Sequence, residues 1–342
     1  MVRPVLFASV LAISAIITGA FAHPLQSSVE VEAGDARLAG TLTLPSEPPR
    51  ALLVMITGTG PHGRDGVISG APMFAELADA LAAGGVATIR VDEAGVGEST
   101  GERTQSFRER IPHVAATLDH ARSLEGFAGV PVGFYGHSEG ASLAVLVAAE
   151  RPQDVDLLVL AGVPGARGHN VWVDQQHTLL AGQFQHLDSD GIRAALTAVA
   201  DASAAGQREP VYAAVRALFE LLEAPDHVYE DGSFEQYASR MASVEMRDFL
   251  DYDPAPAFGG VQAPTLAVWG AIDRQTSPAL NAPILERARG DDPAYTAVVL
   301  PEQDHFFLRG AGLEPGEHRF GEMSLAPELP DAIISWLDAT LR

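Results

Sequence analysis

The chain has 342 residues, with 45 acidic and 22 basic side chains, a formal net charge of −23 at pH 7 and no cysteine. Such a charge repels the phosphates of nucleic acid and of anionic lipid, so neither is an expected partner. The absence of cysteine excludes disulfides and a lipid-bearing N-terminal cysteine, so the apolar core must stabilise the fold.

The first 22 residues have the pattern of a secretory signal peptide. Arg3 is their only charged side chain, an apolar run covers residues 5–17, and Ala20-Phe21-Ala22 has the small-x-small form that signal peptidase reads. We therefore expect an exported protein, periplasmic or secreted, that is cleaved before His23. The alternative is an uncleaved membrane anchor, because residues 4–22 carry no charge and approach the length of a membrane span.

The rest of the chain has the pattern of strands that alternate with helices. Residues 28–33 and 37–44 alternate apolar and polar side chains around Gly34-Asp35, which predicts a β-hairpin. Uniformly apolar runs follow at 51–56, 85–91, 131–135, 155–161, 264–269 and 296–300. Helical patterns lie at 72–83, 107–124, 139–149 and 330–341. Strands that are apolar throughout predict a mostly parallel sheet covered by helices on both faces.

One connection, residues 162–263, is much longer than a single crossover helix needs. Apolar residues recur in it at helical spacing, at Val211, Val215, Leu218 and Leu222. We expect a helical lid at 164–254, inserted between a first part of the core at 23–163 and a second part at 255–342. A separate C-terminal domain fits less well, because two core strands and an amphipathic helix follow the connection.

Two segments match the Gly-x-Ser-x-Gly pattern of a nucleophile elbow, in which a tight strand-to-helix turn lifts the serine to the sheet edge. They are Gly136-His137-Ser138-Glu139-Gly140 and Gly97-Glu98-Ser99-Thr100-Gly101. An apolar strand precedes Ser138 and an apolar helix follows it, whereas a polar loop surrounds Ser99. We predict that Ser138 is the nucleophile and that Ser99 closes a structural turn.

In proteins with this elbow, the acid and the histidine of the triad follow the serine, each after its own strand. Asp273 and His305 occupy these positions. His318 fits less well because its Gly- and Glu-rich surroundings suggest a solvated loop, and Asp304 is too close to His305 in sequence to orient its ring. The prediction is a Ser138–Asp273–His305 triad, in which His305 takes the serine proton and Asp273 holds the imidazole.

An oxyanion intermediate needs hydrogen-bond donors that are in place beforehand. The loop Gly58-Thr59-Gly60-Pro61 follows the first uniformly apolar strand, where such enzymes place one donor. We predict the backbone N–H groups of Thr59 and of Glu139 as the oxyanion hole. Alternatively, the glycines only turn the chain. A phosphate-binding loop is excluded because no Gly-Lys-Ser/Thr follows.

Together these segments resemble the bacterial α/β-hydrolase family that contains EstD-like carboxylesterases and serine aminopeptidase-type hydrolases. The matching stretches are Gly58-Thr59-Gly60-Pro61 with Arg64-Asp65-Gly66, Asp92 with Gly95-Val96-Gly97 and Ser99-Thr100-Gly101, the elbow around Ser138, Gly270 with Asp273, and Asp304-His305-Phe306. The resemblance implies the α/β-hydrolase fold with an inserted helical lid, and it assigns the same triad and oxyanion residues. The family usually has basic residues in the turn at 92–98, including one at the position of Ala94, and this chain lacks them.

The expected function is hydrolysis of carboxylic esters of short to medium acyl length through an acyl-enzyme, without a metal or an organic cofactor. The expected partner is a small ester or a short peptide-like molecule. One alternative is a serine aminopeptidase in which Glu220, Glu223 or Asp226 of the lid captures the substrate's amino group. Another is a binding protein that keeps the fold without the chemistry. The intact order of Ser, Asp and His disfavours this last reading.

Overall fold

The structure is a computed structural model that describes residues 24–103 and 106–342. The expected signal peptide at 1–22 and its cleavage position before His23 lie outside these residues. Among the residues described, no helix has both the length and the apolar character needed to cross a lipid bilayer.

In the described part of the chain, eight strands form one sheet in the order β1-β2-β6-β3-β7-β8-β9-β10. They are β1 (Leu25–Ala33), β2 (Ala36–Leu44), β3 (Ala51–Ile56), β6 (Val86–Val91), β7 (Val132–His137), β8 (Leu157–Ala161), β9 (Thr265–Gly270) and β10 (Tyr295–Leu300). The β1–β2 hairpin pairs antiparallel with the edge of β6, and all strands from β6 to β10 are parallel. The expected mostly parallel sheet is confirmed.

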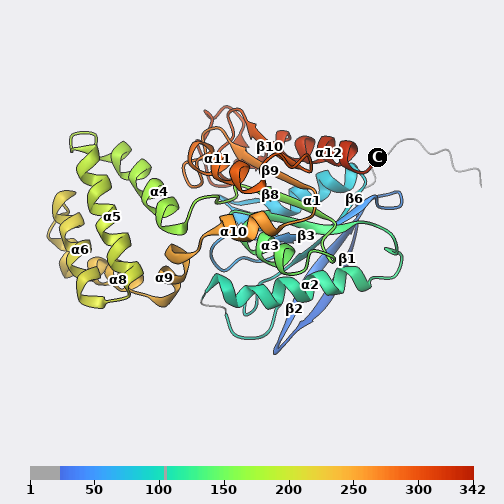
Figure 1. The fold of residues 1–342 in the computed structure, drawn as a ribbon, viewed down its shortest axis with the longest axis horizontal. Coiled ribbons are helices and arrows are strands. Elements are labelled where there is room, and N and C mark those ends of the chain that lie inside the picture. Colours follow the sequence, from blue (N-terminus) through green and yellow to red (C-terminus); the bar gives the residue numbers. More distant parts are fainter. Residues whose placement is uncertain (1–23, 104–105) are drawn as a thin grey trace, which may run out of the picture.

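Alternate side chains of each central strand enter two separate cores, because successive residues of a strand point to opposite faces. On one face, Leu53 and Met55 of β3 pack with α1 (Met73–Ala83) and α12 (Glu328–Thr340). On the other face, Val54 and Ile56 pack with α2 (Ile111–Ser123), α3 (Glu139–Glu150), α10 (Pro254–Gly260) and α11 (Pro278–Arg289). Figure 1 shows α1 and α12 above the sheet and α2 and α3 below it.

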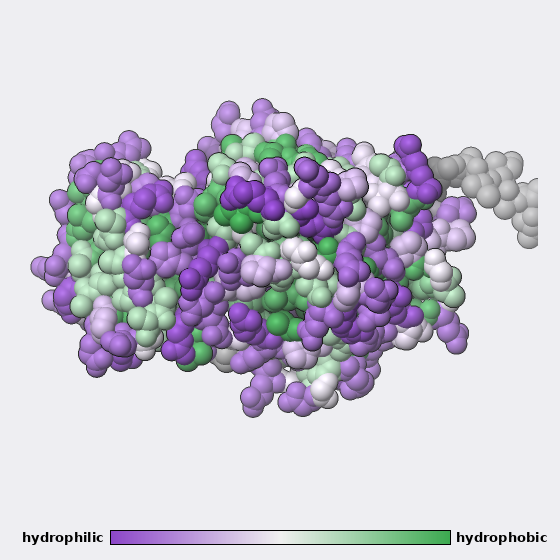
Figure 2. Space-filling model, viewed as in Figure 1, coloured by the Kyte–Doolittle hydropathy of each residue, from purple (hydrophilic) through white to green (hydrophobic). Residues whose placement is uncertain are grey.

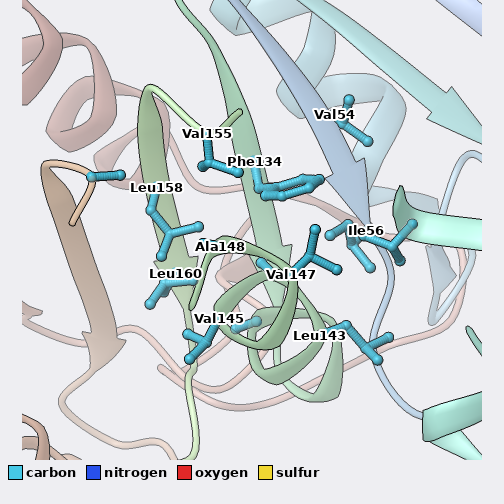
Figure 3. Packing of buried hydrophobic residues seen from close by; sticks show 14 of the residues in the cluster. Val54, Ile56, Phe134, Leu143, Val145, Val147, Ala148, Val155, Leu158 and Leu160 are labelled. Atoms are coloured by element: carbon cyan, nitrogen blue, oxygen red, sulfur yellow. The ribbon is translucent and has the colours of Figure 1, made fainter. Parts of the chain in front are cut away.

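The helix α3, which begins directly after Ser138, is fixed by this second core. Leu143, Val147 and Ala148 of α3 are buried against the sheet. In Figure 3, Val147 lies beside Phe134 of β7 and Ile56 of β3. Cores pack at nearly crystalline density, so a helix held by so many apolar contacts has one position relative to the strand before it.

Between β8 and β9 the chain leaves the sheet and forms a separate group of helices, which we call the helical insertion (residues 168–251). Its helices are α4 (Gly168–Gln183), α5 (Ser189–Ala205), α6 (Arg208–Leu221), α7 (His227–Glu230), α8 (Ser233–Met241) and α9 (Val244–Asp251). They bury an apolar cluster of their own, and Figure 1 shows them as a lobe beside the sheet. The face drawn in Figure 2 is largely hydrophilic on both lobes, with apolar residues in small patches.

Five short elements complete the fold around the sheet's carboxyl edge. They are the hairpin of β4 (Val67–Ile68) and β5 (Ala71–Pro72), the pair of β11 (Leu308–Gly310) and β12 (Met323–Leu325), and the 3-10 helix η1 (Phe107–Arg110) that leads into α2.

Candidate active site

Ser138 stands on a strained turn between β7 and α3. Its backbone has φ 56° and ψ −123°, a region that residues with a side chain rarely adopt, and the N–H of Ser138 is held by the carbonyl of Ala161 at 2.8 Å. The two glycines of the motif are needed for close approach. A Cβ on Gly140 would meet the carbonyl oxygen of Ile56, and one on Gly136 would meet that of Gly140. The sheet and the helix therefore fit together only with the small residues of this pattern.

Asp273 and His305 form a buried pair at the same edge of the sheet, after β9 and β10 respectively. His305 Nδ1 lies 2.8 Å from Asp273 Oδ2, and both side chains are almost fully buried. The other carboxylate oxygen accepts the backbone N–H groups of Gln275 and Thr276 at 2.7 and 2.8 Å. Since Asp273 accepts a proton-bearing Nδ1, the second nitrogen of His305, Nε2, remains as the basic one.

Electrostatics keep Asp273 ionised. Burial would raise the pKa of this carboxyl group, but the charge and hydrogen bond of His305 and the two backbone N–H groups outweigh it, so the pKa lies below its ordinary value. A carboxylate held in this way fixes the orientation and the tautomer of the imidazole ring.

Three cavities meet around Ser138, and Thr59 and Gln275 line all of them. The first, which we call the slot, has a volume of about 70 Å³ and lies between Ser138 and the insertion, with Val171 and Phe249 in its wall. The second, the groove, has about 170 Å³ and is lined by both Ser138 and His305. The third, the outer cavity, has about 680 Å³ and separates the insertion from the core.

The expected oxyanion residues lie beside Ser138. The hydroxyl of Thr59 donates to the Glu139 carboxylate at 3.2 Å, which joins the loop after β3 to the start of α3. A Cβ on Gly58 would lie 3.2 Å from that of Ser138, so the loop runs directly past the serine. The N–H of Glu139 belongs to the first turn of α3, where backbone donors have no partner within the helix.

Arg110 at the end of η1 holds this arrangement together, although no local sequence pattern pointed to it. Its guanidinium donates to the carbonyl oxygens of Thr57 and Gly58 at 2.9 Å, and it pairs with Glu139 at 3.1 Å and with Glu93 at 2.9 Å. The side chain is buried, so these bonds act in a medium of low dielectric. Burial raises the pKa of Glu93, although the charge of Arg110 opposes this. One arginine thus ties the loop after β3 to the elbow.

Ser99, the second motif serine, closes a turn away from the site. Its hydroxyl donates to the Asp92 carbonyl at 2.8 Å and accepts the N–H of Ala39 at 2.9 Å. The turn lacks the family's basic residue at position 94, and Ala94 instead packs among apolar side chains of the β1–β2 hairpin. The cation beside this turn is Arg64, which comes from a different loop and pairs with the Asp92 carboxylate at 2.6 Å.

Comparison with known proteins identifies part of the chain by sequence. Residues 47–187, less than half of the chain, match the model of the family described as serine aminopeptidase, S33. Human monoglyceride lipase is 35% identical over 110 residues, which cover 32% of this chain and 33% of the lipase. A monoglyceride lipase homolog of monkeypox virus is 29% identical over 114 residues, which cover 33% and 38% of the two chains. The match therefore spans only about a third of the length of these curated relatives.

Solved structures match nearly the whole chain. Proline iminopeptidase of Mycobacterium smegmatis superposes with a TM-score of 0.55 at 20% identity, over 92% of this chain and 99% of that one. An esterase of Pyrococcus furiosus gives 0.55 at 13% identity, over 92% and 90%. Dienelactone hydrolase of Anabaena variabilis gives 0.52 at 18% identity, over 93% and 98%. The chain has the α/β-hydrolase fold. Sequence identities this low support a common fold but not a common reaction.

His137 is a further residue of the candidate site that could not be identified from a sequence motif. Its Nε2 lies 2.8 Å from the carbonyl oxygen of His305, so a neutral His137 donates a hydrogen bond there and positions the backbone of His305. Burial and the neighbouring His305 lower the pKa of His137 to about 3, which keeps the ring neutral. The sequence feature that could have pointed to this contact is a histidine in an otherwise apolar strand.

The structure corrects the expectation for His318 and supports the one for Asp304. His318 is not a solvated loop residue: only 19% of its side chain is exposed, and its Nε2 lies 2.5 Å from Asp304 Oδ2. Asp304 therefore binds His318 instead of orienting His305. This pair links the loop that precedes β12 to the residue directly before His305.

The lid acids expected to capture a substrate amine are not brought to the site. Glu220, Glu223 and Asp226 lie at the end of α6 and in the turn after it, and none of them lines the slot, the groove or the outer cavity. Glu223 instead lies 3.9 Å from His186 at the surface of the insertion.

Proposed function

We propose that this chain is an exported serine hydrolase that cleaves carboxylic esters of short to medium acyl length through an acyl-enzyme on Ser138. The observation that carries the proposal is the buried 2.8 Å hydrogen bond between His305 and Asp273, at the edge where Ser138 stands on a strained turn. Ser138 and His305 line the same groove, so the free Nε2 of His305 and the serine hydroxyl face a common space.

The proposed reaction has two halves, acylation and deacylation, and the same side chains act in both. His305 Nε2 takes the Ser138 proton while Oγ attacks the ester carbonyl, and the N–H groups of Thr59 and Glu139 bind the oxyanion. His305 then gives the proton to the alcohol oxygen, which leaves. In the second half, His305 takes a proton from water, which attacks the acyl-enzyme, and then returns the proton to Ser138 Oγ. Asp273 remains ionised throughout and stabilises the imidazolium.

Ester cleavage is favoured over the removal of N-terminal amino acids because the acids near Ser138 are occupied. An aminopeptidase needs a carboxylate for the substrate's ammonium group, and Glu93 and Glu139 both pair with Arg110. The names of the lipase and esterase relatives agree with this choice, as do the motifs shared with EstD-like carboxylesterases.

A serine aminopeptidase is the second candidate, favoured by the description of the matching family and by one residue. Glu245 of α9 lines the outer cavity, and no arginine pairs with it in the part of the chain that the structure describes. In that case Glu245, and not the acids at the end of α6, would hold the amine.

Two further parts of the proposal concern export and the insertion. Export rests on Arg3, the apolar run and Ala20-Phe21-Ala22. N-terminal sequencing of periplasmic or secreted protein should begin at His23, whereas Met1 on membrane-bound protein would favour an anchor. We take residues 164–254 as a lid, because its side chains line the slot and the outer cavity.

The experiment compares p-nitrophenyl esters of two to six carbons with alanine and proline p-nitroanilides, using the mature protein and Ser138→Ala. We expect kcat/KM for the best ester to exceed that for either anilide by at least about 100-fold, and Ser138→Ala to abolish both. An anilide that matches the best ester would replace the proposal by the aminopeptidase. A further loss of anilide activity in Glu245→Gln would then identify the amine site.

A further inference from the structure

The two cavities beside Ser138 distinguish the two halves of an ester. His305 must protonate the leaving alcohol, so the alcohol has to lie on the side of Ser138 that His305 faces. Among the described residues, His305 lines the groove and does not line the slot. The alcohol therefore occupies the groove, and the slot receives the acyl group.

The groove is the larger of these two cavities. Its volume is about 170 Å³, whereas that of the slot is about 70 Å³. At roughly 10–15 Å³ for each water-sized group, the groove holds about eleven to seventeen such groups and the slot about five to seven. A substituent of about eight carbons therefore fits the groove and exceeds the slot.

The outer cavity adjoins the slot but not the serine. Phe107 and Phe249 line both spaces, whereas Ser138 lines the slot and is not among the described residues that line the outer cavity. An acyl group bound to Ser138 therefore enters the slot first, and a longer one has to pass these two rings to extend further. The space next to the ester carbonyl is thus small on the acyl side.

Apolar side chains from the core on the α1 face of the sheet form the walls of the groove. Met73 and Phe74 stand at the start of α1 and are each 1% exposed, while Ile68 of β4 and Phe306 pack against the same core. The ring of Phe306 is also in contact with that of His305, at 5.2 Å between ring centres. Walls fixed by a packed core form a groove before the substrate binds, and apolar walls favour an apolar alcohol.

Charged alcohols fit this groove poorly. In the part of the chain that the structure describes, neither a carboxylate nor a guanidinium lines it. Two of its polar side chains are engaged within the protein, because His62 Nε2 lies 2.9 Å from the Thr59 carbonyl oxygen and Gln275 Oε1 accepts from Gln175 at 3.3 Å. A charged group would lose its hydration without gaining an ion partner, so the groove suits a neutral alcohol.

We propose that the site selects esters whose bulk lies on the alcohol side, with an acyl group of about two to four carbons and a neutral arylalkyl alcohol of about six to ten carbons. An aromatic alcohol is favoured because the rings of Phe74 and Phe306 line the groove, and contacts between rings add to the burial of apolar area. The inference rests on the proposed ester hydrolysis and adds to it which half of the ester is large.

The test compares two isomeric esters that exchange one group between the two sides. In 2-phenylethyl acetate the phenylethyl group is on the alcohol, and in methyl 3-phenylpropanoate it is on the acyl carbon. Each kcat/KM is measured by titration of the released acid and is divided by the ester's rate constant with hydroxide, which removes intrinsic reactivity. In the wild type we expect the corrected value for 2-phenylethyl acetate to be at least about tenfold higher.

Two substitutions then change the cavities separately, since Ile68→Trp narrows the groove and Val171→Phe narrows the slot. The readout is kcat/KM for 2-phenylethyl acetate divided by that for methyl butyrate, a ratio that does not depend on the amount of folded protein. It should fall at least about fivefold in Ile68→Trp and rise in Val171→Phe, because butyryl fills the slot and acetyl does not. Val299→Trp is the matched control: this exposed residue of β10 lines none of the three cavities, and the ratio should stay at the wild-type value.

Two results would overturn this inference and leave the proposed function standing. One is Ser138-dependent hydrolysis of methyl 3-phenylpropanoate at a corrected rate equal to or above that of 2-phenylethyl acetate. The other is a ratio that Ile68→Trp leaves unchanged. If Ser138→Ala hydrolysed both isomers as fast as the wild type, the inference and the proposed function would fall together.

Discussion

Replacing Arg110 with lysine keeps the charge of this side chain and removes its geometry. The guanidinium reaches two carbonyl oxygens, of Thr57 and Gly58, and two carboxylates, of Glu93 and Glu139, at 2.9–3.1 Å. An ammonium group on a flexible stem has three donors at a single point and cannot serve four acceptors in these directions.

Two effects of the substitution follow, and each has its own magnitude. A buried carbonyl oxygen that loses its partner costs about 1–3 kcal/mol, which corresponds to a decrease in Tm of roughly 2–12 °C. The loop that carries Thr59 would also shift relative to Ser138. Complete loss of one oxyanion donor lowers kcat by about 10²–10³-fold, so a displaced donor should lower kcat by roughly 10–100-fold while KM changes by less than about threefold.

Steady-state hydrolysis of p-nitrophenyl butyrate measures the kinetic effect, and thermal denaturation measures the effect on stability. The matched control is Arg122→Lys in α2, whose guanidinium binds the Asp154 carbonyl and the Asp156 carboxylate at 3.0 Å at the surface. This control should leave kcat within about twofold of the wild type. If Arg110→Lys lowers Tm but leaves kcat unchanged, Arg110 stabilises the fold without positioning the Thr59 donor for catalysis.

Three further substitutions test other parts of the site. The folded protein keeps His137 neutral down to about pH 3, whereas the unfolded chain protonates it near 6.5, so stability is lost as pH falls through this range. In His137→Gln the decrease in Tm between pH 7 and 4 should be shallower, and equal slopes would contradict this. Ser99→Ala should keep fluorophosphonate labelling but lose about 1–3 kcal/mol in urea unfolding, because the N–H of Ala39 and the carbonyl of Asp92 lose their partner. Asp273→Asn should lower kcat by about 10⁴-fold, since the amide favours the wrong imidazole tautomer, and a loss below tenfold would exclude Asp273 as the acid.

The sheet could be predicted from sequence because burial on both faces leaves a simple signal. Every residue of β3 is buried, and its bounds agree with the apolar run from 51 to 56. Boundaries that depend on individual side chains could not be predicted. The expected helix at 107–124 is divided into η1 and α2, because Ser106 and Glu109 cap the first turn and Pro112 begins a new one.

In the candidate site, too, some residues could be predicted from the sequence and others could not. Ser138 was predicted from a local pattern of glycines between a strand and a helix. Asp273 and His305 were predicted from their order in the chain and from the apolar strands just before them. Arg110 and His137 act through backbone carbonyls 52 and 168 residues away in the chain, and no local pattern records such contacts.

The loop residues show why local composition can mislead. Gly and Glu around His318 suggested a solvated side chain, but the fold brings this loop against Asp304, and the histidine becomes mostly buried. The turn at 92–98 lacks the family's basic residue, yet Arg64 supplies a cation from a different loop. In both cases tertiary contacts determine the environment.

Ser138 is the proposed nucleophile, and covalent labelling with a fluorophosphonate tests this assignment. The mature protein is treated with a fluorophosphonate, digested, and analysed by mass spectrometry for the modified peptide. We expect a single modification on Ser138, which is absent in Ser138→Ala and is greatly slowed in a variant without the His305 imidazole. A modified peptide that contains Ser99, or unmodified protein with full esterase activity, would contradict it.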